Sequence, residues 1–77
     1  MIDPKLAKLV AQTLKISQDQ VTPQLESGAI PAWDSLGHLQ LFMQLERQFG
    51  IKFKTDEIMN KRTIQEIQDA LSQRGVL

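Results

Sequence analysis

The chain contains no cysteine and a single histidine, which limits how a domain of 77 residues can be held together. Disulfides and thiolate-bound metals, the usual supports of small folds, are both excluded, and so is a histidine-rich metal site. An apolar fraction of 42% and a charged fraction of 23% argue against a disordered chain. We therefore expect one domain over residues 1–77, held together by ordinary apolar packing and without a metal.

Charge and hydropathy exclude further classes of protein. Nine basic and nine acidic residues leave no net charge, whereas nucleic-acid binding usually requires a net or clustered positive field. No stretch approaches the roughly 20 apolar residues that cross a membrane, and the N-terminus lacks the regions of a signal peptide. These observations predict a soluble protein of the cytoplasm with no nucleic-acid partner and no membrane span.

Helix-capping residues and apolar residues at helical spacing divide the chain into four helices. Asp3 and Asp34 are good N-caps, Thr55 is expected to cap a short helix, and Thr63 opens a capping box. Gly50 is a typical helix stop. The sequence therefore predicts an all-α four-helix bundle of three longer helices and one short one, over approximately residues 4–15, 35–49, 55–60 and 64–74.

A long connection joins the first two helices. Between Ile16 and Trp33 the helical pattern is broken by prolines, a glycine and polar residues. Structureless loops longer than roughly 12–15 residues are uncommon in small domains and are often functional. We expect four of its apolar residues to hold it against the core, with one short helical turn: Val21, Leu25, Ile30 and Trp33. Packing rather than ligand stacking is expected for Trp33.

The helix over residues 35–49 carries more apolar surface than one core requires. At 100° per residue, one arc of about 100° is enough to face the core, and it holds Leu41, Phe42, Leu45 and Phe49. A separate arc, roughly 60° wide, holds Leu36, Leu39 and Met43, which we call the Leu36–Met43 stripe. Either the last two helices cover this stripe or it docks a partner, and the helical wheel favours neither.

Ser35 stands at the start of this helix, between the two arcs. A serine at a helix start is most often a cap. Asp34 is equally able to cap, which would leave Ser35 within the first turn. There, unpaired N–H groups and the positive end of the helix dipole favour a phosphate or a phosphodiester. A serine at this position is therefore also suited to carry a phospho-linked group.

The segment around Ser35 resembles the acyl carrier proteins. The resemblance is carried by Trp33-Asp34-Ser35-Leu36, Gly37-His38-Leu39-Gln40-Leu41, Leu45-Glu46 and Phe49-Gly50-Ile51. The triplet Asp34-Ser35-Leu36 is similar to the family's phosphopantetheine attachment motif and follows a long loop at the start of the second helix. The order of the helices fits the family along the whole chain. The resemblance implies a four-helix carrier fold in which the protein itself catalyses nothing.

The resemblance also implies a cofactor and the enzymes that act on it. A phosphopantetheinyl transferase would move a 4'-phosphopantetheine arm from coenzyme A to the Ser35 hydroxyl, and Asp34 would help to hold the transferase's magnesium. The thiol of the arm would then carry an acyl or aminoacyl group as a thioester, which suits a chain without cysteine. The expected partners are an acyl or aminoacyl ligase, an acyltransferase or a synthase. We expect a monomer, which suits a carrier that must visit several enzymes.

The resemblance also implies roles for two groups of residues. Family positions that face partner enzymes are matched by Leu36, Leu39, Gln40, Met43 and Arg47. The core arc would line a cavity that shelters an acyl chain. The residues expected in this cavity and in the core are Leu41, Phe42, Leu45, Phe49, Ile58, Ile67 and Leu71.

The charges depart from those of fatty-acid-synthesis carriers, which are typically strongly acidic along this helix. Glu46 is the one acid within residues 35–49, and residues 47–62 hold five cations against two acids, a balance of +3. Charge complementarity governs partner choice and encounter rate. We therefore expect a specialised lipid, polyketide or cell-envelope pathway rather than a housekeeping fatty-acid synthase. The pattern is also similar to D-alanyl carrier proteins, so acyl and aminoacyl cargo both stay open.

Other functions fit the sequence less well. His38 follows Ser35 by one turn, but a Ser–His dyad needs an orienting acid and an oxyanion site, so we expect a partly buried histidine with a backbone or water partner. The cations of residues 47–62 predict a solvated or docking face rather than a DNA-binding one. The alternative from another class is an unmodified helical adaptor that binds a partner helix through the Leu36–Met43 stripe.

Overall fold

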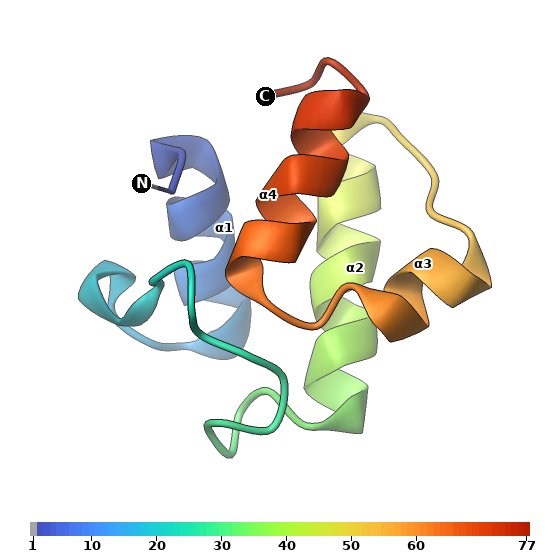
Figure 1. Ribbon diagram of the computed structural model, residues 1–77. Helices are drawn as coiled ribbons and strands as arrows, with labels where there is room; N and C mark the ends of the chain where they lie inside the picture. The colour runs from blue at the N-terminus through green and yellow to red at the C-terminus, as the bar shows by residue number, and fades with distance from the viewer. Residues whose placement is uncertain (1) are drawn as a thin grey trace.

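Four α-helices and one 3-10 turn make up the computed structural model, which describes residues 2–77. The elements in chain order are α1 (Pro4–Leu14), η1 (Gln18–Gln20), α2 (Ser35–Phe49), α3 (Thr55–Asn60) and α4 (Ile64–Gln73) (Figure 1). Residues 2–77 form no β-strand, and their extended pairing is limited to an isolated bridge between Glu26 and Thr63. The predicted all-α fold class is confirmed.

The helices begin and end close to the predicted caps. The side chains of Asp34 and Thr63 each accept a hydrogen bond from a backbone N–H in the first turn of the helix that follows. α1 ends at Leu14, one residue earlier than expected, because Lys15 adopts a left-handed conformation with φ of 57°. The short helical turn predicted in the long connection is η1.

α3 is only six residues long, and contacts from other elements hold it in place. Its N-cap is Lys54, so the predicted cap Thr55 is instead its first residue. Glu57 forms an ion pair with Arg74 at the end of α4, with an N–O distance of 2.7 Å. The Arg74 guanidinium and the backbone N–H of Lys54 lower the pKa of Glu57 from its usual value of 4.5. The same guanidinium lies over the ring of Phe53, 4.5 Å from its centroid.

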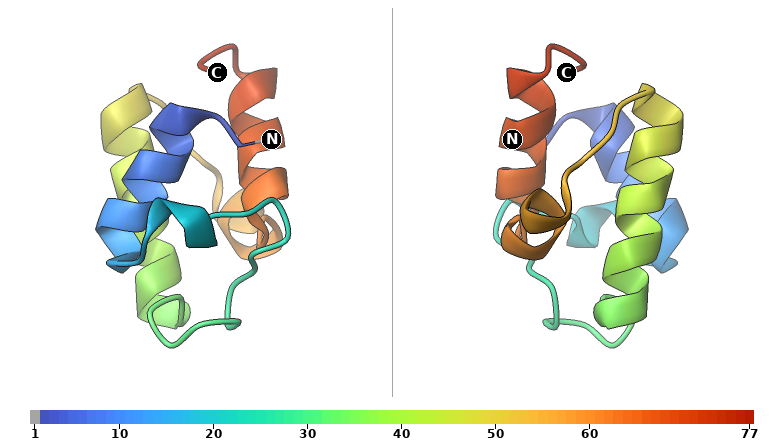
Figure 2. Two further views of the ribbon diagram at one scale, coloured as in Figure 1. Left: turned by 90° about the vertical axis from the view of Figure 1, so that its left-hand side faces the viewer. Right: turned by 90° about the vertical axis from the view of Figure 1, so that its right-hand side faces the viewer.

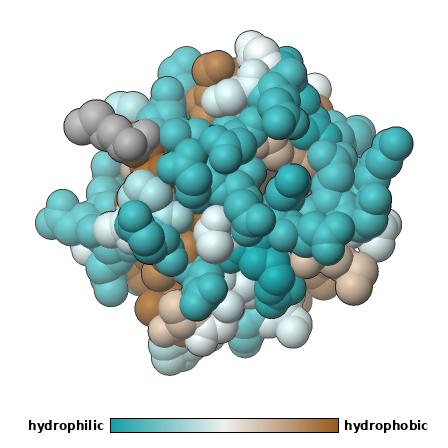
Figure 3. Space-filling model, in the orientation of Figure 1, coloured by the Kyte–Doolittle hydropathy of each residue, from teal (hydrophilic) through white to brown (hydrophobic). Residues whose placement is uncertain are grey.

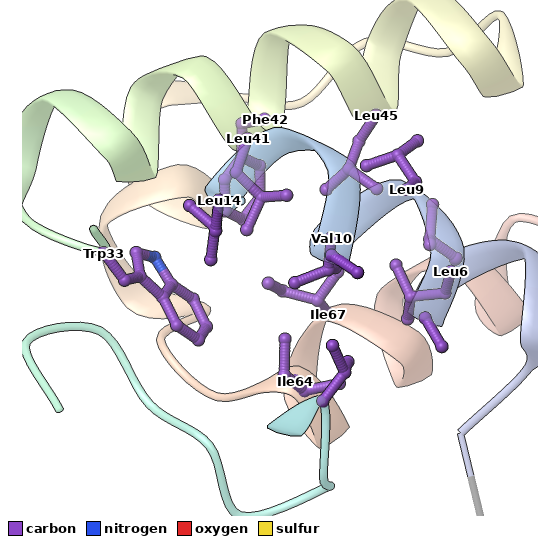
Figure 4. Packing of buried hydrophobic residues seen from close by; sticks show 14 of the residues in the cluster. Leu6, Leu9, Val10, Leu14, Trp33, Leu41, Phe42, Leu45, Ile64 and Ile67 are labelled. Carbon is purple, nitrogen blue, oxygen red and sulfur yellow. The ribbon is translucent and has the colours of Figure 1, made fainter. Parts of the chain in front are cut away.

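The core lies where α1, α2 and α4 face one another, and α3 sits near the N-terminal half of α2 (Figures 1 and 2). Side chains from these helices and from the connection before α2 point towards a common centre (Figure 4). The largest fully buried side chains are Trp33, Phe42, Leu6, Leu41, Leu45, Ile64, Ile67, Leu71 and Val10. Trp33 comes from the connection rather than from a helix, which confirms its predicted packing role.

The long connection before α2 is anchored at the start of α4. The N–H of Ser27 donates to the carbonyl oxygen of Arg62 at 2.8 Å, and the N–H of Ile64 donates to that of Leu25 at 3.0 Å. The apolar residues predicted to hold it do so, with Val21 and Trp33 buried and Leu25 and Ile30 partly buried against the core. The connection therefore has a defined path up to the start of α2.

Polar side chains cover most of the face shown in Figure 3, where hydrophobic residues form only small, separated areas. Among residues 2–77, four large apolar side chains are nevertheless more than half exposed: Leu36, Leu39, Met43 and Met59. Within residues 2–77, no helix is long and apolar enough to cross a membrane.

Candidate functional site

Ser35 is the first residue of α2, and its side chain is exposed. The residue before it, Asp34, caps the helix, since its Oδ1 accepts a hydrogen bond from the N–H of Gly37 at 2.8 Å. Because Asp34 fills this role, the helix does not require the Ser35 hydroxyl as a cap. The hydroxyl is therefore presented to solvent at a helix start, accessible to an enzyme.

The backbone around Ser35 suits a phosphodiester. Within residues 2–77, the N–H groups of Ser35 and Leu36 donate to no protein acceptor, whereas those of Gly37 and His38 both bond to Asp34. Unpaired N–H groups and the positive end of a helix dipole stabilise a nearby phosphate. The residues present at this helix end therefore fit a phosphate-linked arm on the serine.

The connection approaches the first turn of α2 so closely that only glycine fits at position 37. Gly37 is buried, and a Cβ at this position would overlap the carbonyl oxygen of Ala32. The backbone just before Ser35 therefore lies directly against the first turn of the helix. A single glycine in a first turn does not reveal such a contact in the sequence, because the Ala32 carbonyl approaches it only in the folded chain.

Two hydrogen bonds join the start of α2 to the connection and to α3. The indole Nε1–H of Trp33 donates to Nδ1 of His38 at 2.9 Å, and Nε2 of His38 lies 2.6 Å from the carbonyl oxygen of Ile58. An indole can only donate, so Nδ1 must accept and Nε2 must carry the hydrogen that is donated to Ile58. We call this arrangement the Trp33–His38–Ile58 chain.

The Trp33–His38–Ile58 chain of hydrogen bonds confirms the predicted backbone partner of His38. It also shows a second partner that the sequence did not indicate, the Trp33 side chain. His38 is only 5% exposed. Both of its ring nitrogens are used, so neither is available to deprotonate the Ser35 hydroxyl. The arrangement therefore positions the serine's helix and does not form a catalytic dyad.

The Leu36–Met43 stripe is exposed to solvent. Its three side chains are between 53% and 64% exposed, so α3 and α4 do not cover it. Gln40 and Arg47, which were predicted to belong to the same docking face, are exposed as well. The sequence did not single out Met59 on α3, which is 64% exposed.

Comparison with known proteins shows the family to which the chain belongs. A family model described as "Phosphopantetheine attachment site" matches residues 33–71, just over half of the chain. An acyl carrier protein of Thermosynechococcus vestitus is 27% identical over 70 residues, covering 91% of this chain and 86% of that protein. An acyl carrier protein of Nitratidesulfovibrio vulgaris is 28% identical over 71 residues, covering 92% and 90%. The chain belongs to the acyl carrier protein family.

Membership of the acyl carrier protein family defines the cofactor and the class of the protein. The matched region begins two residues before Ser35 and ends at Leu71 on α4. Acyl carrier proteins hold a covalently attached 4'-phosphopantetheine, and this is the cofactor of the chain. They are carriers rather than catalysts, and the nearby His38, whose two ring nitrogens are both hydrogen-bonded, is not placed to activate the Ser35 hydroxyl.

The residues predicted for the core and the acyl cavity are closely packed. Five of the seven residues predicted for the core and the acyl cavity are at most 1% exposed: Leu41, Phe42, Leu45, Ile67 and Leu71. Phe49 and Ile58 are only partly buried at the edge of the same cluster. A hollow of about 360 Å³ lies at the surface between α1 and α2, and its lining includes Phe49. An acyl cavity along the core arc stays a prediction.

Proposed function

We propose that Ser35 carries the 4'-phosphopantetheine arm and that the chain delivers acyl groups, bound to this arm as thioesters, to partner enzymes. The observation that supports this best is the exposed Ser35 hydroxyl, beside two unpaired N–H groups and a cap role already filled by Asp34. The names of the two similar acyl carrier proteins support acyl cargo. The arm, when bound, supplies the thiol that the chain itself lacks.

The chain would be the protein substrate of a phosphopantetheinyl transferase. The Ser35 Oγ would give its proton to a base of the transferase and bond to the phosphorus of the arm, while the pyrophosphate bond of coenzyme A breaks and adenosine bisphosphate leaves. Asp34 would assist by helping to hold the transferase's magnesium. Its Oδ1 caps the helix through Gly37, and the exposed carboxylate could reach the metal through its other oxygen.

Partner enzymes would dock on the Leu36–Met43 stripe together with Gln40 and Arg47. The charge of this surface supports a specialised lipid, polyketide or cell-envelope pathway, because Glu46 is the one acid of α2 and its Oε2 accepts from the N–H of Phe53 at 2.8 Å. We propose a monomeric carrier of the cytoplasm. An aminoacyl cargo is the second candidate, supported by the resemblance to D-alanyl carrier proteins.

Intact-mass measurement after coexpression with a broad-specificity phosphopantetheinyl transferase tests the attachment. We expect the mass of one arm on the natural chain and on Ser72→Ala, an exposed serine of α4 that serves as the control. We expect no addition on Ser35→Ala. An unchanged mass of the natural chain with several transferases would instead support the unmodified helical adaptor.

Loading assays on the modified chain test the pathway. We expect a ligase or transferase from a specialised pathway to load the arm faster than a housekeeping fatty-acid enzyme does, because of the missing acidic residues on α2. Equal or better loading by the housekeeping enzyme would contradict a specialised partner. Loading with an amino acid rather than an acyl group would favour the aminoacyl alternative.

A further inference from the structure

The Leu36–Met43 stripe leads into a surface hollow at the C-terminal end of α2. This hollow measures about 460 Å³, and its lining includes Met43, Arg47, Ile51 and Lys52. Met43 is both the last residue of the stripe and a wall of the hollow, so the two form one continuous surface. The surface begins beside Ser35 and extends about 18 Å along the helix axis to Arg47, at a rise of 1.5 Å per residue.

Two cations at the rim of this hollow have no acidic partner. Arg47 and Lys52 are exposed, and neither forms an ion pair with any carboxylate of residues 2–77. The lining also contains Glu46, whose Oε2 is turned to the backbone N–H of Phe53 at 2.8 Å. The hollow therefore presents an excess of positive charge next to apolar surface.

We propose that this hollow binds an acidic, apolar segment of the enzyme that loads or unloads the carrier. An apolar side chain of the partner would lie on Met43 and Ile51, and its carboxylates would contact Arg47 and Lys52. Charge complementarity selects the carboxylates, and an exposed methionine is an adaptable apolar contact. The proposal rests on the proposed function, because it names the chemistry of the partner that visits the same carrier.

The shape of the site favours a protein segment over a lipid surface. A membrane with anionic lipids would also supply negative charge, but a flat bilayer does not enter a hollow, whereas a protruding helix or loop does. The hollow between α1 and α2 is also rimmed by two cations, Lys5 and Lys8. No residue of the Leu36–Met43 stripe lines it, so it serves as a matched control.

A peptide titration of the unmodified full chain tests the proposal. The probe is a short helical peptide with leucines and glutamates on one face, and binding is followed by the NMR shifts of the backbone amides. We expect shifts in α2 and in residues 50–52, around the hollow. Combining Arg47→Glu with Lys52→Glu should weaken binding by at least about tenfold, because two attractive contacts become repulsive.

The combination of Lys5→Glu with Lys8→Glu changes the net charge equally and should leave the affinity within about twofold. Equal weakening by both double variants would overturn the proposal, because it would show a response to net charge alone. Equal binding of a peptide with lysines in place of the glutamates would overturn it as well. So would binding to anionic phospholipid vesicles under conditions in which the glutamate peptide does not bind.

Two further measurements separate the possible failures. Circular dichroism shows whether each variant folds, and the milder combination of Arg47→Gln with Lys52→Gln replaces any that does not. Intact mass after treatment with the transferase reports on Ser35 alone and does not involve the peptide. A natural chain that is modified normally but does not bind the peptide would refute only the hollow, whereas a natural chain that is not modified would refute the carrier function.

Discussion

At the scale of single residues, His38 joins three parts of the molecule. Its nitrogens bond to the Trp33 indole and to the Ile58 carbonyl, and its ring lies 4.8 Å from that of Phe42, centroid to centroid. Buried polar groups cost free energy unless they are paired, and both nitrogens of this ring are paired. The residues before Ser35, the helix that it begins and α3 are thereby held in one arrangement.

His38→Ala is expected to lower the free energy of unfolding by about 2–4 kcal/mol, because it leaves a cavity and deprives the buried Trp33 N–H of its acceptor. Urea unfolding followed by fluorescence measures the change, since Trp33 is the one tryptophan of the chain. The control is Gln40→Ala, exposed on the same helix, with an expected change below about 0.5 kcal/mol. A loss no larger than that of the control would show that the Trp33–His38–Ile58 chain contributes no stability.

Gly37→Ala is expected to reverse the usual effect of this substitution. In an unconstrained helix, replacing glycine by alanine stabilises by about 1 kcal/mol. At position 37 the added Cβ would overlap the Ala32 carbonyl oxygen, so the backbone before Ser35 must shift. We expect a lower free energy of unfolding and slower modification of Ser35, measured by urea unfolding and by intact mass over time. A stabilised variant with a normal rate of modification would mean that this contact yields easily.

At the scale of elements, the helix cap and the exposed hydroxyl at the start of α2 belong to two different residues. Asp34 accepts the N–H of Gly37, and Ser35, one residue later, keeps an exposed hydroxyl. Had Ser35 been the cap, its oxygen would have been held by a backbone N–H of the same turn. Asp34 is therefore the residue whose structural and proposed chemical roles have to be separated by experiment.

Asp34→Asn and Asp34→Ala separate these roles. Asparagine caps helices as well as aspartate does, so only the alanine variant should lose stability, by about 1 kcal/mol. If the carboxylate assists transfer, both variants should be modified more slowly than the natural chain. Urea unfolding gives the stability and intact mass over time gives the rate. Modification of the asparagine variant at the natural rate would remove Asp34 from the transfer step.

At the scale of the whole molecule, the net charge is zero but the charges are unevenly distributed along the chain. Residues 47–62 carry a balance of +3, and two of their cations rim the hollow at the far end of α2 from Ser35. Ser35 and the charged hollow are thus separated along one helix and connected by the exposed stripe. A partner that uses both would align itself with α2, which is how a carrier without strong acidity along this helix could still be recognised.

Helix positions were predictable because their signals are local. Asp34, Thr63 and Gly50 act on residues within one turn of themselves, and the structure places caps at all three. The predicted cap of α3, Thr55, was wrong by one residue. The actual cap, Lys54, is a residue type that gives only a weak capping signal in a sequence. The path of the long connection was not predictable in detail, because it depends on bonds to α4 from residues that are far apart in the chain.

The sequence by itself determined the all-α class, the four helices and the candidate serine, because periodicity, caps and a short motif are properties of neighbouring residues. Only the tertiary structure decided that the Leu36–Met43 stripe is uncovered, that His38 bonds to Trp33, and that Met43 leads to a hollow with Arg47 and Lys52. Each of these depends on how separate elements pack. A helical wheel shows which residues share a face, but the face that remains exposed depends on where the other helices lie.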